Sequence, residues 1–199
     1  MTEQQNGFHV QSNGDSHDDY LFDPDLLQST FDKYALENSK LVKNLYNERF
    51  LIRPLKISDY NYEYIDLLRQ LTECGTIEND EFQKRFNEMK QCLNTYFIIV
   101  IEDLNNNRQI VGSATLIVEK KFIRQLAVRG RIEDVVVDSR CRGQQLGKIL
   151  LEILTAFGRD YCQCYKISLE CRDPLVSFYQ QFGYKHEDKQ NYLCKRYIN

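Results

Sequence analysis

The sequence predicts one α+β domain, a mixed central sheet flanked by helices, in the order β-α-α-β-β-β-α-β-α-β. Three observations lead to this class. Apolar runs of strand length alternate with helical patterns, several strands cluster in the middle of the chain, and a strand-helix-strand unit follows them. The 199 residues, 42% of them hydrophobic, are enough for one well-packed domain but hardly for two.

The first segment, residues 1–48, is expected to be an acidic extension that precedes the domain. Residues 1–20 are polar and lack periodicity, which is typical of a largely disordered tail. Scattered apolar positions between Asp23 and Leu45 are expected to form one short helix or a segment that lies on the domain. The domain itself is therefore expected to span residues 49–199.

The domain is expected to begin with one strand and two helices. The strand covers residues 50–53 and ends at Pro54. The first helix can be capped by Ser58 or Asp59 and run to Cys74, with Gly75 as its stop. Its apolar face consists of Tyr64, Leu67, Leu68 and Leu71. A second helix, capped by Asn79, carries at helical spacing Phe82, Phe86 and Met89.

The middle of the chain is expected to form three strands. Residues 96–102 and 109–119 flank a polar turn, as the two strands of a hairpin do. A third strand covers residues 131–138. Its three consecutive valines, Val135 to Val137, are expected to be buried on both faces of the sheet.

The C-terminal part is expected to alternate helix and strand. A strong amphipathic helix comes first, with one apolar face made of Leu146, Ile149, Leu150, Ile153, Leu154 and Phe157. A strand over residues 165–170, a helix over residues 174–182 and a final strand over residues 190–198 follow it.

Composition excludes several classes of protein. The net charge is −3, and nine acidic residues lie within residues 1–50, so the rest lacks the broad basic surface of nucleic-acid-binding proteins. No apolar run approaches the roughly 20 residues that a transmembrane helix needs. The N-terminus lacks the apolar core of a secretory signal and the early basic residues of a mitochondrial presequence. We therefore expect a cytoplasmic protein, with peripheral docking on a membrane surface left open.

The seven cysteines are expected to be reduced thiols rather than metal ligands. A zinc site needs closely paired ligands, and the chain has no CxxC pair. Cys162 and Cys164 are one residue apart, and the nearest histidine is His186. We therefore expect no metal.

A glycine-containing turn, residues 142–147, leads from the third central strand directly into the amphipathic helix. The first N–H groups of a helix have no helical acceptor, and the helix dipole favours negative charge there. Such a turn suits a phosphate or pyrophosphate. Its spacing differs from both GxGxxG and the P-loop. An ordinary strand-to-helix turn with surface arginines is the alternative reading.

The same turn is similar to the Q/R-x-x-G-x-G/A signature of the GNAT superfamily of N-acetyltransferases, with Gln145 at the position of the first glycine. Five further segments extend the likeness: residues 131–137, 164–171 and 178–184, together with Leu71-Thr72-Glu73 and Lys121-Phe122-Ile123-Arg124. In these details the chain resembles the glucosamine-6-phosphate N-acetyltransferases over roughly residues 50–199. The resemblance implies the GNAT fold, whose splayed strands form a cleft for acetyl-CoA as co-substrate.

The resemblance also implies where acetyl-CoA binds. Backbone amides of the splayed strand would pair with the pantetheine arm, and the N–H of Val135 would hold the oxyanion. Tyr179 would donate a proton to the leaving thiolate, although its aromatic neighbours at helical spacing also suit a core residue. Leu175 stands where such enzymes often carry an Asn that bonds the pantetheine, so that contact is not expected. The implied acetyl-CoA residues are Val135, Val136, Val137, Arg142, Gly143, Gln144, Gln145, Leu146, Gly147, Lys148 and Tyr179.

The implied acceptor is D-glucosamine 6-phosphate. Glu133 and Asp134 are adjacent on a strand, so regular pleating sends them to opposite faces unless a bulge re-aims one of them. Glu133 is expected to accept the ammonium proton, with solvent as the alternative. The implied acceptor residues are Thr72, Lys121, Phe122, Ile123, Arg124, Glu133, Asp134, Val135, Glu170 and Arg196.

Three basic residues, Lys121, Arg124 and Arg196, are candidates for binding the sugar phosphate, because a dianion needs several donors. Each alone is more often a solvated surface residue. In the family that the chain resembles, the last strand crosses to the other subunit. The resemblance therefore implies a homodimer with shared sites, in which Arg196 and Glu170 come from the partner.

Together these implications predict an enzyme that transfers the acetyl group of acetyl-CoA directly to the amine of D-glucosamine 6-phosphate. The product would be N-acetyl-D-glucosamine 6-phosphate, a precursor of UDP-N-acetylglucosamine. A ping-pong reaction through Cys141 is disfavoured, because this residue lies beside the pyrophosphate turn and far from the thioester. The alternatives are a GNAT enzyme that acts on a protein or peptide amine and a non-catalytic acyl-CoA-binding module.

Overall fold

The computed structural model describes residues 16–37 and 49–197. The chain divides into two compact units, Met1–Leu169 and Glu170–Asn199. The first unit contains the central sheet and the long helices, and the second contains two short helical turns.

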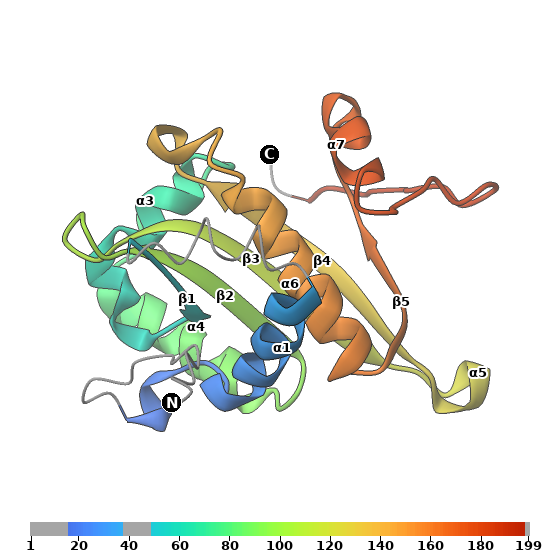
Figure 1. Ribbon diagram of the computed structural model, residues 1–199, viewed down its shortest axis with the longest axis horizontal. Coiled ribbons are helices and arrows are strands. Elements are labelled where there is room, and N and C mark those ends of the chain that lie inside the picture. The colour runs from blue at the N-terminus through green and yellow to red at the C-terminus, as the bar shows by residue number, and fades with distance from the viewer. Residues whose placement is uncertain (1–15, 38–48, 198–199) are drawn as a thin grey trace, which may run out of the picture. The chain divides into compact units, whose positions relative to one another are not determined.

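Five strands form one sheet in the order of the chain (Figure 1). The first four pair antiparallel with their neighbours, and the last pairs parallel with the fourth. The expected strands from residue 50 to residue 170 are thereby confirmed. Their bounds are β1 (Phe50–Pro54), β2 (Tyr96–Asp103), β3 (Gln109–Lys120), β4 (Val128–Val137) and β5 (Cys164–Leu169).

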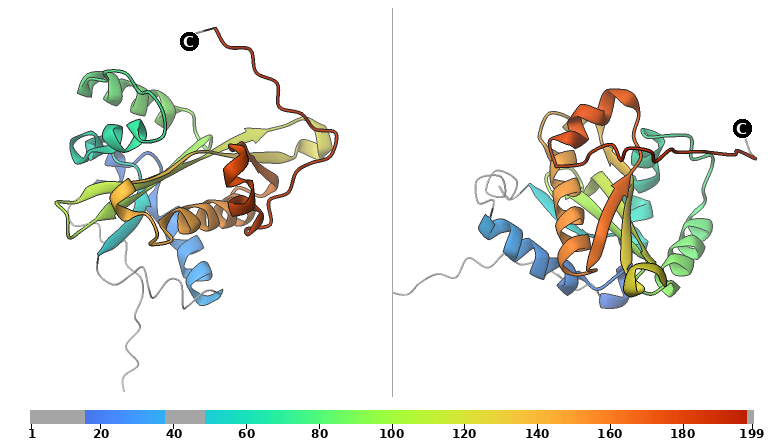
Figure 2. Two further views of the ribbon diagram at one scale, coloured as in Figure 1. Left: turned by 90° about the horizontal axis from the view of Figure 1, so that it is seen from above. Right: turned by 90° about the vertical axis from the view of Figure 1, so that its right-hand side faces the viewer.

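Helices cover both faces of this sheet, which gives three layers (Figure 2). One face carries α1 (Pro24–Glu37) and α6 (Leu146–Asp160), and the other carries α3 (Tyr64–Arg69) and α4 (Asn79–Gln91). Within the described residues, the first unit also contains the helical segments η1 (His17–Asp19), η2 (Ile57–Tyr62), α5 (Ile123–Leu126) and η3 (Ser139–Cys141). The second unit contains η4 (Asp173–Leu175) and α7 (Val176–Gln180).

The core has two halves because the apolar run of β2 faces both layers. Phe97 contacts Phe157 of α6 on one face, whereas Ile98 packs on the other face with residues of α3 and α4. All six residues expected on the apolar face of α6 are buried. This helix therefore fixes the position of the turn that precedes it.

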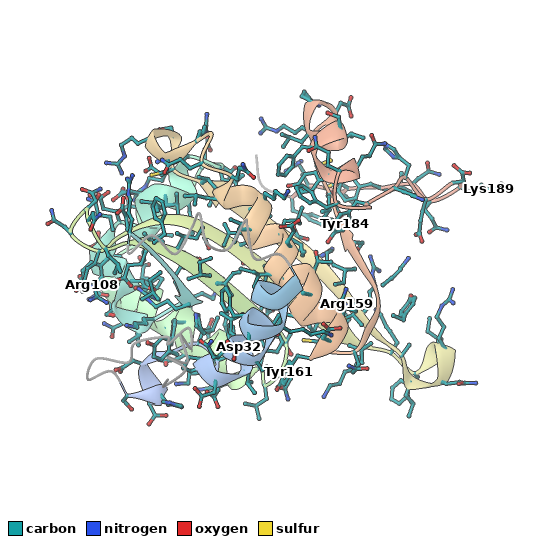
Figure 3. The ribbon with its side chains drawn as sticks, in the orientation of Figure 1. Asp32, Arg108, Arg159, Tyr161, Tyr184 and Lys189 are labelled. Atoms are coloured by element: carbon teal, nitrogen blue, oxygen red, sulfur yellow. The ribbon has the colours of Figure 1, made fainter. Side chains whose placement is uncertain are left out.

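The helix expected in the N-terminal extension forms as α1 and belongs to the core of the first unit. Leu27 and Phe31 are buried, and Lys33 bonds Asp160 of α6 at 2.9 Å. Figure 3 labels Asp32 of α1 near the end of α6, where Arg159 and Tyr161, the residue that follows the helix, are labelled. The expected disordered tail is wrong for residues 16–20, which contain η1 and end at the buried Tyr20. Residues 1–15 and 38–48 lie outside the described residues, so their disorder stays a prediction.

The expected helix from Ser58 to Cys74 is wrong as one element. Glu63 adopts a left-handed conformation with φ of 64°, which divides the segment into η2 and α3. The helix also ends at Arg69, so Leu71 is exposed. The second helix is confirmed, with Glu78 rather than Asn79 as its cap.

Three details of the C-terminal half also differ from expectation. Of the three valines at the end of β4, only Val136 is buried, because β5 does not extend far enough to cover its neighbours. The helix expected over residues 174–182 is shorter, since Pro174 lies in η4 and α7 ends at Gln180. Residues 190–197 form no strand in this chain, since a strand needs a neighbour to pair with; Ile198 lies outside the described residues.

Candidate active site

The end of β4 has a free edge on the side of β5. The pairing of these two strands ends at Ile132 and Leu169, so residues 133–137 have no β5 partner. The opposite edge of the same residues pairs with β3. The two parallel strands therefore part at Glu133, as the resemblance to a splayed sheet implies.

A β-bulge lies where the edge becomes free. Glu133 pairs with Thr115 and Val136 pairs with Ser113, so Asp134 and Val135 together face one residue of β3. Asp134 has a φ of 53°, a left-handed value that few residues other than glycine adopt. The bulge that Glu133 and Asp134 require in order to share a side of the sheet is thus present.

The bulge turns both carboxylates toward the layer that contains α3. Regular pleating would place Glu133 and Val136, three residues apart, on opposite faces of the sheet, but the bulge places them on the same face. Val136 packs on that face in one cluster with Tyr64 of α3. Burial raises the pKa of the Tyr64 hydroxyl, and the negative charge of Asp134 raises it further. Partial burial also raises the pKa of the Asp134 carboxyl above its ordinary value.

Glu133 has a basic neighbour that the sequence analysis missed. Arg131 Nε lies 2.6 Å from Glu133 Oε1. Residues two apart on a strand share a face, so the spacing alone could have indicated this pair. An incoming ammonium group would compete with the guanidinium for the same carboxylate.

The turn into α6 presents backbone rather than side chains. Gly143 has a φ of 80°, and a Cβ added there would meet no atom within 4 Å. Gln145 has a φ of 62° and caps α6 without a side-chain hydrogen bond. The first turn of α6 contains no acidic residue and contains Lys148. Uncapped N–H groups beside a lysine form a favourable environment for an anion.

Gly147 holds the start of α6 close to β4. A Cβ on Gly147 would lie 3.6 Å from Val137 Cγ2, an ordinary van der Waals distance. The free edge of β4 and the uncapped start of α6 are therefore adjacent. An extended ligand with an anionic end fits this arrangement, with its amide groups along the strand and its phosphates at the turn.

The basic residues of the β3–β4 hairpin lie at the other end of β4. Lys121 pairs with Glu119, and Arg124 Cζ lies 5.2 Å from the ring centroid of Tyr165 in β5. Val128, just after the hairpin tip, is about 17 Å from Glu133 at 3.3 Å per strand residue. One chain therefore does not bring Lys121 and Arg124 together with Glu133.

The hairpin tip is apolar and strained. Arg124, Gln125 and Leu126 all have left-handed φ values between 54° and 62°. Phe122 is 93% exposed, and Ile123 and Leu126 are also exposed. The expected acceptor residues Lys121, Phe122, Ile123 and Arg124 thus form a projecting tip rather than a wall of the β4 cleft.

Comparison with known proteins identifies the family. Residues 62–184 match the model of the acetyltransferase (GNAT) family, which is more than half of the chain. This chain belongs to the GNAT acetyltransferase family.

The most informative relatives of this GNAT protein have one activity in their names. A probable glucosamine 6-phosphate N-acetyltransferase of Drosophila melanogaster is 42% identical over 168 residues, which are 83% of this chain and 75% of the relative. A glucosamine 6-phosphate N-acetyltransferase of Arabidopsis thaliana is 40% identical over 146 residues, 72% of this chain and 95% of the relative. A crystal structure of the Arabidopsis thaliana enzyme superposes with a TM-score of 0.70 at 38% identity, covering 75% of this chain and 99% of that one.

Cys141, the candidate for a ping-pong reaction, is buried in this GNAT protein. The residue is 4% exposed, and burial raises the pKa of its thiol. A buried, protonated thiol attacks a thioester poorly, because the thiolate is the reactive species.

Thr72 lies beyond the end of α3, where it is exposed and its N–H bonds the carbonyl of Leu68 at 3.2 Å. The preceding residues of α3 pack against β3 and β4. Thr72 is thus attached to the same layer toward which the bulge turns Glu133 and Asp134. Its contact with the sugar stays a prediction.

Three expected site residues belong to the second unit of this GNAT protein, which is described by itself. Tyr179 is buried in α7, with its ring 5.1 Å from that of Phe178, and burial raises the pKa of its hydroxyl. Glu170 and Arg196 are exposed. The predicted proximity of these residues to β4 stays a prediction.

The described residues contain one cluster of possible metal ligands, and it is outside this site. His17, Asp23 and Asp25 are exposed, and their ligand atoms lie within 4.8 Å of one another. The candidate site itself is built from carboxylates, backbone amides and basic side chains. The expectation of a metal-independent reaction stays a prediction.

Proposed function

We propose that this protein transfers the acetyl group of acetyl-CoA to the amine of D-glucosamine 6-phosphate. The observation that carries the proposal is the edge of β4 that β5 leaves unpaired, residues 134–137, leading into the uncapped start of α6. The names of the relatives in Drosophila melanogaster, Arabidopsis thaliana and Dictyostelium discoideum support the choice of acceptor. The product, N-acetyl-D-glucosamine 6-phosphate, would feed UDP-N-acetylglucosamine synthesis in the cytoplasm. No helix in the described part of the chain is long and apolar enough to cross a membrane.

Acetyl-CoA would lie along β4 with its pyrophosphate at the turn. The amides of the pantetheine arm pair with the free backbone groups of residues 135–137, which would otherwise bond only to water. The phosphates accept from the N–H groups between Arg142 and Lys148, with both basic side chains nearby. The thioester then lies beside Val135, whose N–H stabilises the oxyanion of the tetrahedral intermediate.

The acceptor amine would attack the thioester carbonyl directly. One ammonium proton passes to Glu133 or to water, and the free amine then forms the nitrogen–carbon bond. The carbon–sulfur bond breaks as the tetrahedral intermediate collapses, and the nitrogen loses its second proton to solvent as the amide forms. The thiolate receives a proton from the Tyr179 hydroxyl. The burial of Cys141 supports direct transfer, and initial-rate plots should intersect rather than run parallel.

The acceptor site would be shared between two subunits. A hexose phosphate is much shorter than the roughly 17 Å between Glu133 and the hairpin tip of the same chain. Lys121 and the exposed Arg124 would therefore serve a site in a second copy. Residues 190–197, which have no strand partner in one chain, would pair with that copy and bring Arg196 to its phosphate.

The two alternatives make different demands on the site. A peptide acceptor does not require the basic residues Lys121, Arg124 and Arg196, which are candidates for binding a phosphate. A non-catalytic acyl-CoA-binding module requires neither the carboxylate of Glu133 nor the hydroxyl of Tyr179. We therefore favour a small phosphorylated amine over both.

A panel of amines tests the proposal. Release of CoA thiol from acetyl-CoA is measured with glucosamine 6-phosphate, glucosamine and a lysine peptide. A charged hydrogen bond to phosphate contributes about 1.5–3 kcal/mol, so kcat/KM should be at least about 10-fold higher for the phosphorylated sugar than for glucosamine. Equal values for the two sugars would exclude the phosphate site, and preference for the peptide would favour the alternative enzyme.

A further inference from the structure

Gln70, just after the end of α3, connects α3 to the end of β4. Its Nε2 donates to Asp138 Oδ2 at 3.0 Å, and its Oε1 accepts from the backbone N–H of Ser139 at 2.9 Å. Asp138 directly follows β4, and Ser139 is the first residue of η3. One side-chain amide thus holds both the carboxylate and the backbone at the point where the strand ends.

Asp138 is the centre of this connection. Its carboxylate is buried and accepts from the backbone N–H of Arg140 at 2.8 Å and from Arg140 Nε at 2.9 Å and Nη2 at 2.8 Å. Its own N–H donates to the carbonyl of Val111 at the start of β3, at 2.9 Å. The residue is therefore fixed by its backbone to the sheet and by its side chain to the turn.

Arg140 extends the connection to the other end of α3. Its Nη2 lies 3.6 Å from Oε2 of Glu63, the left-handed residue at which α3 begins. Gln109 at the start of β3 donates to the same Glu63 carboxylate. Both ends of a six-residue helix are thus linked to the residues that precede the turn.

These links matter because the turn itself is exposed. Arg142, Gly143, Gln144 and Gln145 are all exposed, and the buried residues Cys141 and Leu146 lie on either side. The position of the turn therefore depends on where its two ends are held. The apolar face of α6 holds one end, and the group formed by Gln70, Asp138 and Arg140, here called the α3 clamp, holds the other.

We propose that Gln70, Asp138 and Arg140 are positioning residues for acetyl-CoA. The α3 clamp holds the turn in its phosphate-binding conformation before the ligand arrives, so binding does not have to order it. The inference rests on the proposed function, since it takes CoA as the ligand of this turn. None of the three residues needs to touch the ligand for this effect.

The experiment measures CoA binding by calorimetry for the wild type, Gln70→Ala, Arg140→Ala and the double variant. Each variant leaves the buried Asp138 carboxylate with fewer donors, so the melting temperature should fall by several degrees, and binding is measured at a temperature where every variant is fully folded. Loss of a clamp hydrogen bond should raise the Kd for CoA about 3- to 10-fold. The KM for acetyl-CoA should rise by a similar factor, while kcat and the KM for the sugar change little.

The matched control is Asp160→Asn at the far end of α6. Asp160 accepts from Arg159 and Lys33 much as Asp138 accepts from Arg140 and Gln70. It is remote from the turn, so its loss should leave the Kd for CoA unchanged. A similar increase in this control would mean that general loss of stability, not positioning, weakens CoA binding, and would overturn the clamp.

The double variant distinguishes positioning from direct contact. Both residues act through Asp138, so the double variant should weaken CoA binding by less than the product of the two single effects. A rise in the Kd of the double variant equal to the product of the two single effects would mean that Arg140 binds the phosphates itself. An unchanged Kd in both single variants would mean that the clamp has no role. Absence of CoA binding by the wild type would instead reject the proposed function, and the clamp with it.

Discussion

The backbone of single residues shapes this site more than their side chains do. Asp134, Gly143 and Gln145 all have left-handed φ values, and each lies at a point where β4 or the turn changes direction. Such a conformation costs a residue with a Cβ roughly 1–2 kcal/mol. Gln145 occupies the position of a signature glycine, and its φ of 62° explains why glycine is favoured there.

Substitution of the two turn glycines should have opposite effects on the free energy of unfolding. Gly143→Ala should lower it by about 1–2 kcal/mol, because the left-handed backbone alone opposes the new Cβ. Gly147→Ala should raise it by about 0.5–1 kcal/mol, since the residue is helical and its Cβ meets Val137 at 3.6 Å. Urea titration checks both. A stable Gly143→Ala variant would show that this turn does not keep its φ of 80° in solution.

Tyr179→Phe should lower kcat and leave the KM for acetyl-CoA nearly unchanged. In the proposed mechanism the hydroxyl supplies a proton to the leaving thiolate. Such assistance is typically worth about 10²–10⁴-fold, and an easily expelled thiolate places this case at the low end. Tyr184→Phe is the matched control, since its ring centroid lies 6.3 Å from that of Tyr179. Equal kcat values with a lower melting temperature for Tyr179→Phe would mean that Tyr179 is only a core residue.

Asp138 should make the protein more stable at neutral than at acid pH. Hydrogen bonds from Arg140 hold the pKa of its carboxyl well below the ordinary value of about 3.9. The stabilisation is therefore complete above the unfolded pKa and is lost as the pH falls toward the lower folded pKa.

Asp138→Asn keeps the shape of the side chain and removes its charge. The difference in free energy of unfolding between wild type and variant should be largest near pH 7 and shrink below about pH 4. Denaturant titrations at several pH values measure it. A difference that grows at low pH would contradict the assigned direction of the pKa shift.

At the scale of elements, α1 is part of the first unit rather than an appendage. Leu27 is fully buried, so Leu27→Ala should lower the free energy of unfolding by about 2–5 kcal/mol. Leu93→Ala, at a position that is 79% exposed, should change it by less than about 0.5 kcal/mol. Equal, small effects in urea titrations would show that α1 does not pack against the domain.

The strength of each local pattern decided which elements could be predicted. The sequence predicts α6, β2 and β3 well, because apolar residues at a regular period indicate both whether a segment is a helix or a strand and where it begins and ends. The break at Glu63 has no glycine or proline to indicate it. The segment over residues 190–197 has a strand pattern. Whether it forms a strand depends on a neighbouring strand to pair with, and a single sequence does not indicate which strand that is.

The candidate site, like the fold, was predictable where local patterns indicate it and not where distant residues meet. The turn before α6 follows from local spacing, and the bulge at Asp134 follows from the need to bring two adjacent carboxylates to one side. The α3 clamp was missed because Gln70 and Asp138 are 68 residues apart and meet only in the folded chain. Polar contacts over such separations leave no periodic signal in one sequence.

At the scale of the whole molecule, the proposed site requires two chains. Glu133 and the hairpin tip of one chain are too far apart for one sugar, and Arg196 is proposed to come from the partner chain. A mixed dimer of Glu133→Gln and Arg196→Ala chains should therefore contain one site in which both residues are intact. This heterodimer, isolated with two tags and assayed at limiting sugar phosphate, should exceed either variant homodimer in activity. Recovery no greater than that of the homodimers would mean that each site is built within one chain.

Identification of the reaction product tests the central claim most directly. The protein is incubated with acetyl-CoA carrying a labelled acetyl group and with glucosamine 6-phosphate, and the product is examined by mass spectrometry and NMR. The account predicts labelled N-acetylglucosamine 6-phosphate in equal amount to the CoA thiol released. Thiol release without an amide product, or label on an amine other than that of the sugar phosphate, would contradict it.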